Sequence, residues 1–390
     1  MKPNQKTIKR SKYIGLEAIN FVLRPLHTSL VSLLIVRLFN VDLWGEFVFF
    51  LISAELVNTV LNWGQKPFLL REFSLKPNKI NEYWSQAIYA RIPLLFLAFI
   101  LLSVTPVFRS YFIPLLLFIV FKWLGGLFES YIQFYRKYLW SISASVLGLL
   151  TALFCVYFFK NKMTLEVLIY IFSFSSFIQF ITLLPLISKW KIPKISTNKI
   201  KTGLLLSLPF FALSIAGLVQ TKGDLYIVTY FLKESQVANY QIIIGFLILA
   251  QTFSAIILGP FQKNIYRWRK KNTFKLKKLY LQIGFVVSIV FTVILYFVLN
   301  NLYLISLSIW HLPLFFAYLY PLYIYLIESQ LLLKHKKEKL LLKDTLIAAF
   351  FNILTALFLV PFYGIYGALF SGIICRLILA GLVLHHSKEQ

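Results

Sequence analysis

Basic side chains lie inside several of the long apolar segments of the chain. Three of them are candidates for binding a substrate: Arg24, Lys122 and Arg376. A charge at the centre of a membrane span costs roughly 2.5–3.5 kcal/mol on insertion scales, so it normally faces a helix-bundle interior or a water-filled cavity. A guanidinium group also suits bidentate contact with a phosphate. We therefore expect these three residues to bind an anionic group of a substrate.

Carboxylates inside apolar segments form a second set with different chemistry. Its members are Glu55, Asp224 and Glu129. A carboxylate within a span can bind and release a proton or a sodium ion, so these residues are candidates for coupling to an ion gradient. Structural alternatives stay open: a basic neighbour can neutralise Glu55, and Asp224 can snorkel with Lys222 toward the outer interface.

Helical spacing places some of these charges on shared faces. Glu17 and Arg24 are seven residues apart, so an ion pair between them is the alternative to phosphate binding by Arg24. Lys122, Gly126 and Glu129 also share a face. There, the basic and the acidic residue can each pair with a neighbouring helix instead of binding a ligand. Ligand binding and ion pairing predict the same helix faces. They differ in whether the partner of the charge is a ligand or another side chain.

The composition requires a membrane. Of the 390 residues, 59% are hydrophobic and 14% are charged, and the mean hydropathy is +0.76. Soluble domains are about 45–50% apolar and about 25% charged. So few charges exclude a soluble enzyme and a disordered protein. The two cysteines both lie in apolar runs, which leaves no disulfide framework and no metal site.

Apolar runs of about 20 residues predict twelve membrane-spanning helices. The runs lie near 14–38, 44–66, 86–105, 111–133, 140–159, 165–188, 202–231, 236–259, 279–299, 302–330, 341–360 and 363–384. The expected fold class is therefore all-α, a polytopic membrane protein. Two six-helix lobes are expected, residues 1–195 and 196–390.

The distribution of basic residues predicts the orientation. The chain has 40 Lys and Arg against 14 Asp and Glu, a net charge of +26. Most of the basic residues fall in the segments that share a side with the N-terminus, so both termini are expected in the cytoplasm. The charge thus reflects topology, and nucleic acid is not an expected partner.

The two halves of the chain resemble each other in order and polarity. IVRLFNVDLWGEFVFFLISAEL starts at Ile35, and IVTYFLKESQVANYQIIIGFLIL starts at Ile227. Each joins a span to the next through a short acidic hinge, and a long basic loop follows the second span. Parallel six-span repeats of this kind predict a substrate site between the halves, near the membrane midplane.

Several segments resemble one transporter family. RLFNVDLWGEF, followed by LNWGQKPFLLREFS, looks like its first two spans; LPFFALSIAGLVQTKGDLYIV from Leu208 looks like its seventh; and VPFYGIYGALFSGIICR from Val360 looks like its terminal hairpin. The family is that of the Wzx-type O-antigen and polysaccharide flippases. It belongs to the multidrug/oligosaccharidyl-lipid/polysaccharide (MOP) exporter superfamily.

The resemblance implies a V-shaped, MATE-like transporter of the bacterial inner membrane. It would move an undecaprenyl-pyrophosphate-linked oligosaccharide from the cytoplasmic to the outer leaflet by alternating access, for O-antigen or lipopolysaccharide biosynthesis. A glycan polymerase and a chain-length regulator are the partners it implies, besides membrane lipids. No cofactor is expected. Whether a proton or a sodium gradient supplies the energy stays open.

Two other functions are weighed against a flippase. A multidrug or cation antiporter of the same superfamily would use the carboxylates, although the predominance of basic groups within the spans argues against cationic drugs. An integral-membrane glycan polymerase is the alternative from an enzyme class. Polymerases of that kind resemble one another in a large extracytoplasmic loop, and the predicted outside loops here are short. The sequence contains no GxxxxGK[ST] phosphate loop, so it favours a transporter that is not itself an enzyme.

Overall fold

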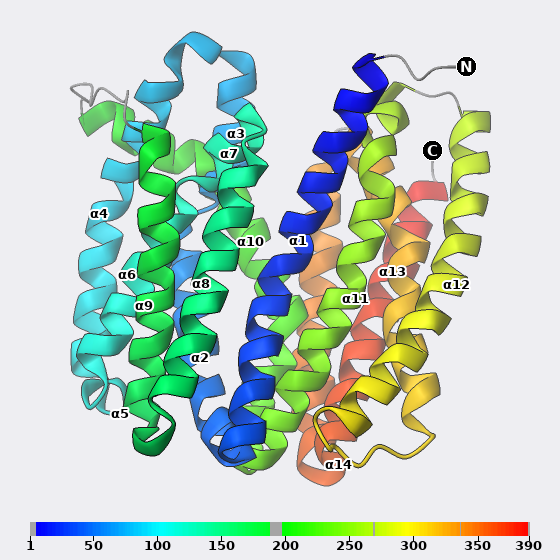
Figure 1. Ribbon diagram of the computed structural model, residues 1–390. Helices are drawn as coiled ribbons and strands as arrows, with labels where there is room; N and C mark the ends of the chain where they lie inside the picture. Colours follow the sequence, from blue (N-terminus) through cyan, green and yellow to red (C-terminus); the bar gives the residue numbers. More distant parts are fainter. Residues whose placement is uncertain (1–4, 188–196, 268–269, 336, 389–390) are drawn as a thin grey trace. The chain divides into compact units, whose positions relative to one another are not determined.

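The computed structural model describes residues 5–187, 197–267, 270–335 and 337–388, and helices make up nearly all of them (Figure 1). The long helices are α1 (Gln5–Leu38), α2 (Val41–Asn62), α4 (Ile80–Val104), α6 (Phe112–Gly126), α8 (Tyr138–Phe158), α9 (Leu165–Leu183), α10 (Thr197–Phe231), α11 (Glu234–Arg267), α12 (Lys270–Asn301), α13 (His311–Lys334) and α14 (Glu338–Lys388). Shorter helices are α3 (Gln65–Leu75), α5 (Pro106–Arg109) and α7 (Glu129–Tyr135), with 3-10 turns at Pro77–Lys79, Lys160–Lys162 and Leu184–Ile187.

Eleven helical segments within the described residues are long and apolar enough to cross a membrane. The last of them, Glu338–Ser387, contains Gly364 at φ 55° and ψ −131°, which divides it into two arms. The two arms bring the count of spans to the predicted twelve. Many large apolar side chains on these helices are exposed, Phe297, Phe358 and Phe362 among them, as a chain in lipid requires. The predicted all-α, multi-pass membrane fold is confirmed.

The chain separates into two compact units. Unit 1 is Met1–His27 with Glu46–Ile215, and unit 2 is Thr28–Gly45 with Ala216–Gln390. The boundaries therefore fall inside α1, α2 and α10. The division into lobes at residues 195 and 196 stays a prediction.

Each unit is a bundle with its own core. In unit 1, α9 packs against both α6 and α8, and α3 packs against α7 (Figure 1). In unit 2, α13 packs against α11, α12 and α14. Leu258, Tyr280, Tyr323 and Ile327 form a buried part of that core.

The tenth span begins later than predicted. Helix α13 starts at His311, and residues 302–310 form a connection. The guanidinium of Arg37 donates to the carbonyl oxygens of Leu302 at 2.6 Å and Asn301 at 2.7 Å, which satisfies the end of α12. Tyr303 is 4% exposed and its hydroxyl donates to the carbonyl of Ser29; burial raises the pKa of this hydroxyl to about 12. These contacts hold an apolar segment out of the helix.

A break divides the second span into α2 and α3. Trp63 and Gly64 both have positive φ, 45° and 65°. Arg91 on α4 is 2% exposed, and its Nε donates to the carbonyl of Asn62 at 3.0 Å while Nη1 donates to Ala87 at 2.6 Å. A cation is favourable at the C-terminal end of a helix, where carbonyls lack partners. Arg91 therefore stabilises the break.

Candidate functional site

Glu55, Asn58 and Asn62 form a polar stripe along α2, and this stripe meets α6 in unit 1 at Asn62. A Cβ atom on Gly126 of α6 would lie 3.5 Å from Oδ1 of Asn62 on α2. Lys122 and Asn58 lie one turn before Gly126 and Asn62 on their respective helices. Asn58 is 5% exposed; its Nδ2 donates to the carbonyl of Ala54 at 3.0 Å, and its Oδ1 has no partner among the described residues. The contact between Asn62 and Gly126 joins the α2 stripe to the predicted face of Lys122 and Gly126.

Lys122 lies close to His27 of α1, and the two side chains interact electrostatically. Nε2 of His27 is 3.2 Å from Oγ of Ser175 on α9, and its ring meets Phe172 edge-on with 6.0 Å between centroids. The ammonium of Lys122 lies 5.2 Å from the ring centre of Phe118. An ammonium beside an imidazole that can donate a hydrogen bond suits an anionic group, because charge-assisted hydrogen bonds are the strong ones.

Two further predicted residues of unit 1 are Glu55 and Arg24. Glu55 lies on the polar stripe of α2, where its carbonyl accepts from the hydroxyl of Thr59 at 2.8 Å and its side chain is half-buried. Arg24 lies on α1, and its side chain lies outside the described residues. The proposed Glu17–Arg24 pair therefore stays a prediction.

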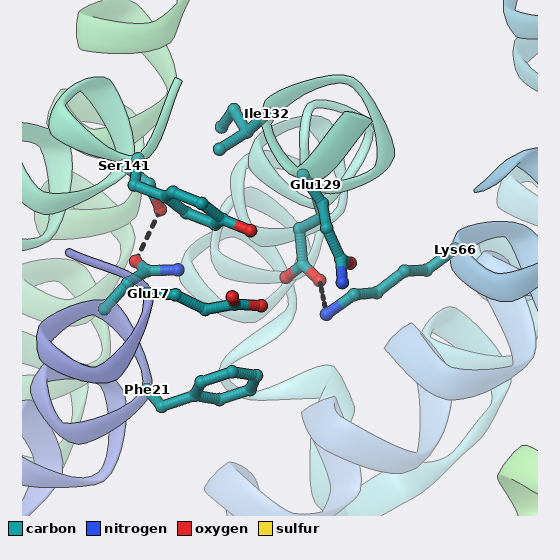
Figure 2. A pocket seen from close by; sticks show the side chains of 9 residues that line it. Glu17, Phe21, Lys66, Glu129, Ile132 and Ser141 are labelled. Atoms are coloured by element: carbon teal, nitrogen blue, oxygen red, sulfur yellow. Dashed lines mark hydrogen bonds and ion pairs between the residues drawn. The ribbon is translucent and has the colours of Figure 1, made fainter. Parts of the chain in front are cut away.

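Figure 2 shows a small pocket in unit 1, lined by residues of α1, α3, α7 and α8. Lys66 of α3 reaches across it, and its Nζ lies 3.1 Å from Oε2 of Glu129. Glu17 points into the same space and interacts with Tyr138, while Ser141 donates to Asn20 at 2.7 Å. The pocket thus holds two carboxylates and one ammonium, and Glu129 has a basic partner that the sequence did not indicate.

The Lys66–Glu129 pair is expected to contribute little to stability. The two side chains are 42% and 25% exposed, and exposed pairs contribute about 0.2–1 kcal/mol. In a double-mutant cycle of Lys66→Met and Glu129→Gln, thermal unfolding in detergent should give a coupling energy below about 1 kcal/mol. The coupling should shrink in 1 M NaCl, where the Debye length is about 3 Å. A coupling well above that range would identify a buried structural pair.

The same variants also separate the two interpretations of Glu129. If Glu129 couples an ion, Glu129→Gln should lower transport while Lys66→Met does not. Equal transport by both variants and the wild type would remove Glu129 from the ion-coupling candidates.

The remaining predicted residues, Asp224 and Arg376, are both buried inside unit 2. Asp224 of α10 is 1% exposed and Arg376 of α14 is 4% exposed. Burial shows that the snorkelling interpretation of Asp224 is wrong. Tyr240 of α11 donates to Oδ2 of Asp224 at 2.5 Å, and the ring centre of Tyr318 on α13 lies 3.5 Å from the guanidinium carbon of Arg376. Each of the two residues therefore has a tyrosine of a neighbouring helix as a partner.

Some residues of these sites could not be identified from the sequence. Nothing in the spacing of Tyr240, Tyr318 and Lys66 along the chain distinguishes them from its other tyrosines and lysines. Arg91 could have been singled out from the sequence, because it is a basic residue in an apolar run. In the described part of the chain, no three His, Cys, Asp or Glu side chains gather so as to hold a metal.

Comparison with known proteins shows the fold. Neither a protein-family model nor a curated protein matches the sequence. Among solved structures, the lipid II flippase MurJ in an inward closed conformation is similar over 96% of this chain and 87% of that one, with a TM-score of 0.77 and 16% identity. The MATE multidrug transporter DinF-BH covers 97% of this chain and 95% of its own, with a TM-score of 0.67 and 14% identity. The chain has the fold of MurJ and the MATE transporters.

A third structure agrees with this assignment. An inward-facing multidrug resistance MATE family transporter of the MOP superfamily matches 97% of this chain and 93% of its own, with a TM-score of 0.63 and 14% identity. The MATE-like fold that the sequence predicted is therefore confirmed. Flippases and multidrug transporters share it, so the substrate has to be argued from the side chains.

Proposed function

We propose that the chain is a transporter of the MOP superfamily that flips a lipid-linked oligosaccharide across the membrane. The observation that carries the proposal is the likeness to a lipid II flippase over nearly the whole chain, with a TM-score of 0.77. Lys122 on α6 supports it, because a lipid-linked pyrophosphate needs a cationic partner away from bulk water.

The finer features follow the resemblance to Wzx-type flippases. The substrate is an undecaprenyl-pyrophosphate-linked repeat unit of O-antigen or a similar polysaccharide, moved outward by alternating access. The protein resides in the bacterial inner membrane with both termini in the cytoplasm. A proton or sodium gradient drives the cycle, and a glycan polymerase and a chain-length regulator are its partners.

A multidrug or cation antiporter is the second candidate. Two of the compared structures are multidrug MATE transporters, and Glu55 offers a half-buried carboxylate on the polar stripe of α2. A cation would have to approach Glu55 on a stripe that faces the helix of Lys122, and the resulting repulsion favours the anionic substrate.

The test deletes the gene in its native host and locates the lipid-linked oligosaccharides. They would be extracted, identified by mass spectrometry and assigned to a leaflet with a membrane-impermeant label. Complete single repeat units trapped on the cytoplasmic leaflet are expected, and re-expression of the wild-type chain should release them.

Two other results would contradict the proposal. Single units that reach the outer leaflet without being polymerised would indicate a polymerase. If no lipid-linked intermediate accumulates and the deleted strain becomes sensitive to cationic drugs, the antiporter is the function.

A further inference from the structure

Two spans of unit 1 are interrupted side by side. Helix α2 ends at Asn62, and two residues with positive φ, Trp63 and Gly64, separate it from α3. Helix α6 ends at Gly126, and α7 follows after two residues. A Cβ atom on Gly126 would lie 3.5 Å from Oδ1 of Asn62, so the two helix ends face each other. The interruptions therefore lie at the same level of the bundle.

The backbone at both interruptions has the geometry of a hinge. Trp63 has φ 45°, which a bulky L residue adopts only where its surroundings hold it there. Between α6 and α7 the helix tightens: the N–H of Phe128 donates to the carbonyl of Gly125 at 3.3 Å, three residues back. A short 3-10 turn within a long helix is a frequent hinge. Residues at the ends of elements can absorb a large change of dihedral angle, so both spans can bend here.

Helix α4 supports both interruptions. Nε of Arg91 donates to the carbonyl of Asn62 at 3.0 Å, and Nε1 of Trp84 donates to the carbonyl of Leu127 at 2.9 Å. Both side chains are 2% exposed, and they are seven residues apart, so they project from one face of α4. Carbonyl groups at the end of a helix lack partners within it. Because α4 supplies such partners at both places, the two spans bend against a common support.

Helices α3 and α7, which follow the interruptions, pack against each other (Figure 1). Near the start of α3, Nζ of Lys66 lies 3.1 Å from Oε2 of Glu129. Near its end, the ring of Phe73 meets the ring of Phe134 edge-on with 5.7 Å between centroids. Contacts at both ends of α3 resist a change in its angle to α7. We call this pair of helices the cap.

The cap is one wall of the pocket in Figure 2. The opposite wall comes from α1 and α8, and the hydroxyl of Ser141 donates there to the amide oxygen of Asn20 at 2.7 Å. Lys66 and Glu129 face this wall from the cap. Ser141 is 7% exposed, so it is hidden while the cap is in place. Movement of the cap away from α1 and α8 would uncover Ser141 and keep the bonds within each wall.

We propose that α3 and α7 turn as one rigid cap about the two interruptions, with α4 as the support, and so open and close the pocket between the cap and the wall formed by α1 and α8. Lys66 and Glu129 then keep the cap in one piece, which gives the pair a mechanical role although its contribution to stability is small. The inference goes beyond the proposed function, because it concerns one unit only and applies equally to a flippase and to an antiporter.

The test measures how fast a thiol placed behind the cap reacts. The parent is the purified full-length protein in detergent with Ser141→Cys, and with Cys155→Ala and Cys375→Ala to remove the native thiols. Its reaction with N-ethylmaleimide is followed by mass spectrometry, and the rate reports the fraction of time for which the pocket is open. In a second sample, a water-soluble carbodiimide first joins Lys66 to Glu129 through an amide bond, since the two side chains are in contact.

A cap that turns as one body keeps its labelling rate when α3 and α7 are joined. Glu129→Gln in the same parent is the matched control, because it can form every other amide bond but not this one. The carbodiimide should therefore change the labelling rate of the parent no more than that of Glu129→Gln. Treatment that slows the parent several-fold more than the control would show that the pocket opens by separation of α3 from α7, and would overturn the proposal.

The support by α4 is tested with Trp84→Phe, which removes the hydrogen bond to Leu127 and keeps an aromatic ring. Labelling should become roughly 2- to 10-fold faster, the factor that corresponds to the loss of one neutral hydrogen bond. Trp123→Phe is the matched control in unit 1 and should label like the parent, because Nε1 of Trp123 is buried and has no hydrogen-bond partner among the described residues.

Three further results would overturn the inference. They are equal rates for Trp84→Phe and Trp123→Phe, no labelling in any variant, and labelling of the parent at the rate of a free thiol. If Trp84→Phe cannot be purified, the carbodiimide experiment still decides whether α3 and α7 move together, because it changes neither interruption. Transport is not measured, so failure here is distinct from failure of the proposed function.

Discussion

Lys122→Ala is expected to lower export of the lipid-linked oligosaccharide at least ten-fold. Lys122 lies one helical turn before Gly126, which faces Asn62 of the α2 polar stripe, and it interacts with His27. Hydrogen bonds to charged groups contribute about 1.5–3 kcal/mol, which corresponds to roughly 10- to 150-fold in an equilibrium constant. The measurement is the amount of repeat unit reaching the outer leaflet when each variant is expressed at equal level in the deleted strain.

Matched variants separate charge from packing at Lys122. Lys122→Arg keeps a cation and should retain most of the export. Lys162→Ala removes the same side chain from the exposed turn Lys160–Lys162 after α8 and should export like the wild type. Wild-type export by Lys122→Ala would assign the lysine to helix packing and would require another residue to bind the anionic group.

Hydropathy predicted the spans well because lipid leaves a helix few alternatives. Backbone groups in a bilayer must be satisfied within the helix, so nearly every long apolar run became one. The turn at Gly364 was also predictable, since glycine tolerates the φ of 55° found there. The late start of α13 was not, because it depends on Arg37 and Tyr303, which contact residues more than 250 positions away.

The candidate sites were predictable as residue types but not as pairs. The cost of a buried charge pointed to Arg376 and Asp224, and both are buried. Their partners could not be chosen from one sequence, because Tyr318 is 58 positions from Arg376 and Lys66 is 63 positions from Glu129. Such contacts depend on how the helices pack, and a helix face defined by spacing fits several neighbours equally well.

Gly64→Ala is expected to be the most destabilising of the small substitutions in unit 1. Gly64 has φ 65°, a conformation that costs an L residue about 1–2 kcal/mol. The added Cβ would lie 2.6 Å from the carbonyl carbon of Phe210 and 2.8 Å from its Cβ. Neither atom can move without displacing α10, and overpacking of this kind costs about 1–3 kcal/mol.

The position of the break makes that clash hard to relieve. Trp63 stacks on Phe211 with 4.1 Å between ring centroids, and its Nε1 donates to the carbonyl of Leu204 at 3.2 Å. Arg91 holds the carbonyl of Asn62 from the other side. A shift of α10 away from the new methyl group would therefore break the stacking and the hydrogen bond together.

The two costs add to about 2–5 kcal/mol, so Gly64→Ala should unfold several degrees below the wild type in detergent. Gly125→Ala is the matched control in the same unit, because a Cβ there would meet nothing within 4 Å. It replaces a helical glycine and should raise stability by about 0.5–1 kcal/mol. Equal unfolding temperatures for the two variants would mean that α2 and α3 do not need the left-handed turn at Gly64, and that the second span tolerates a continuous helix.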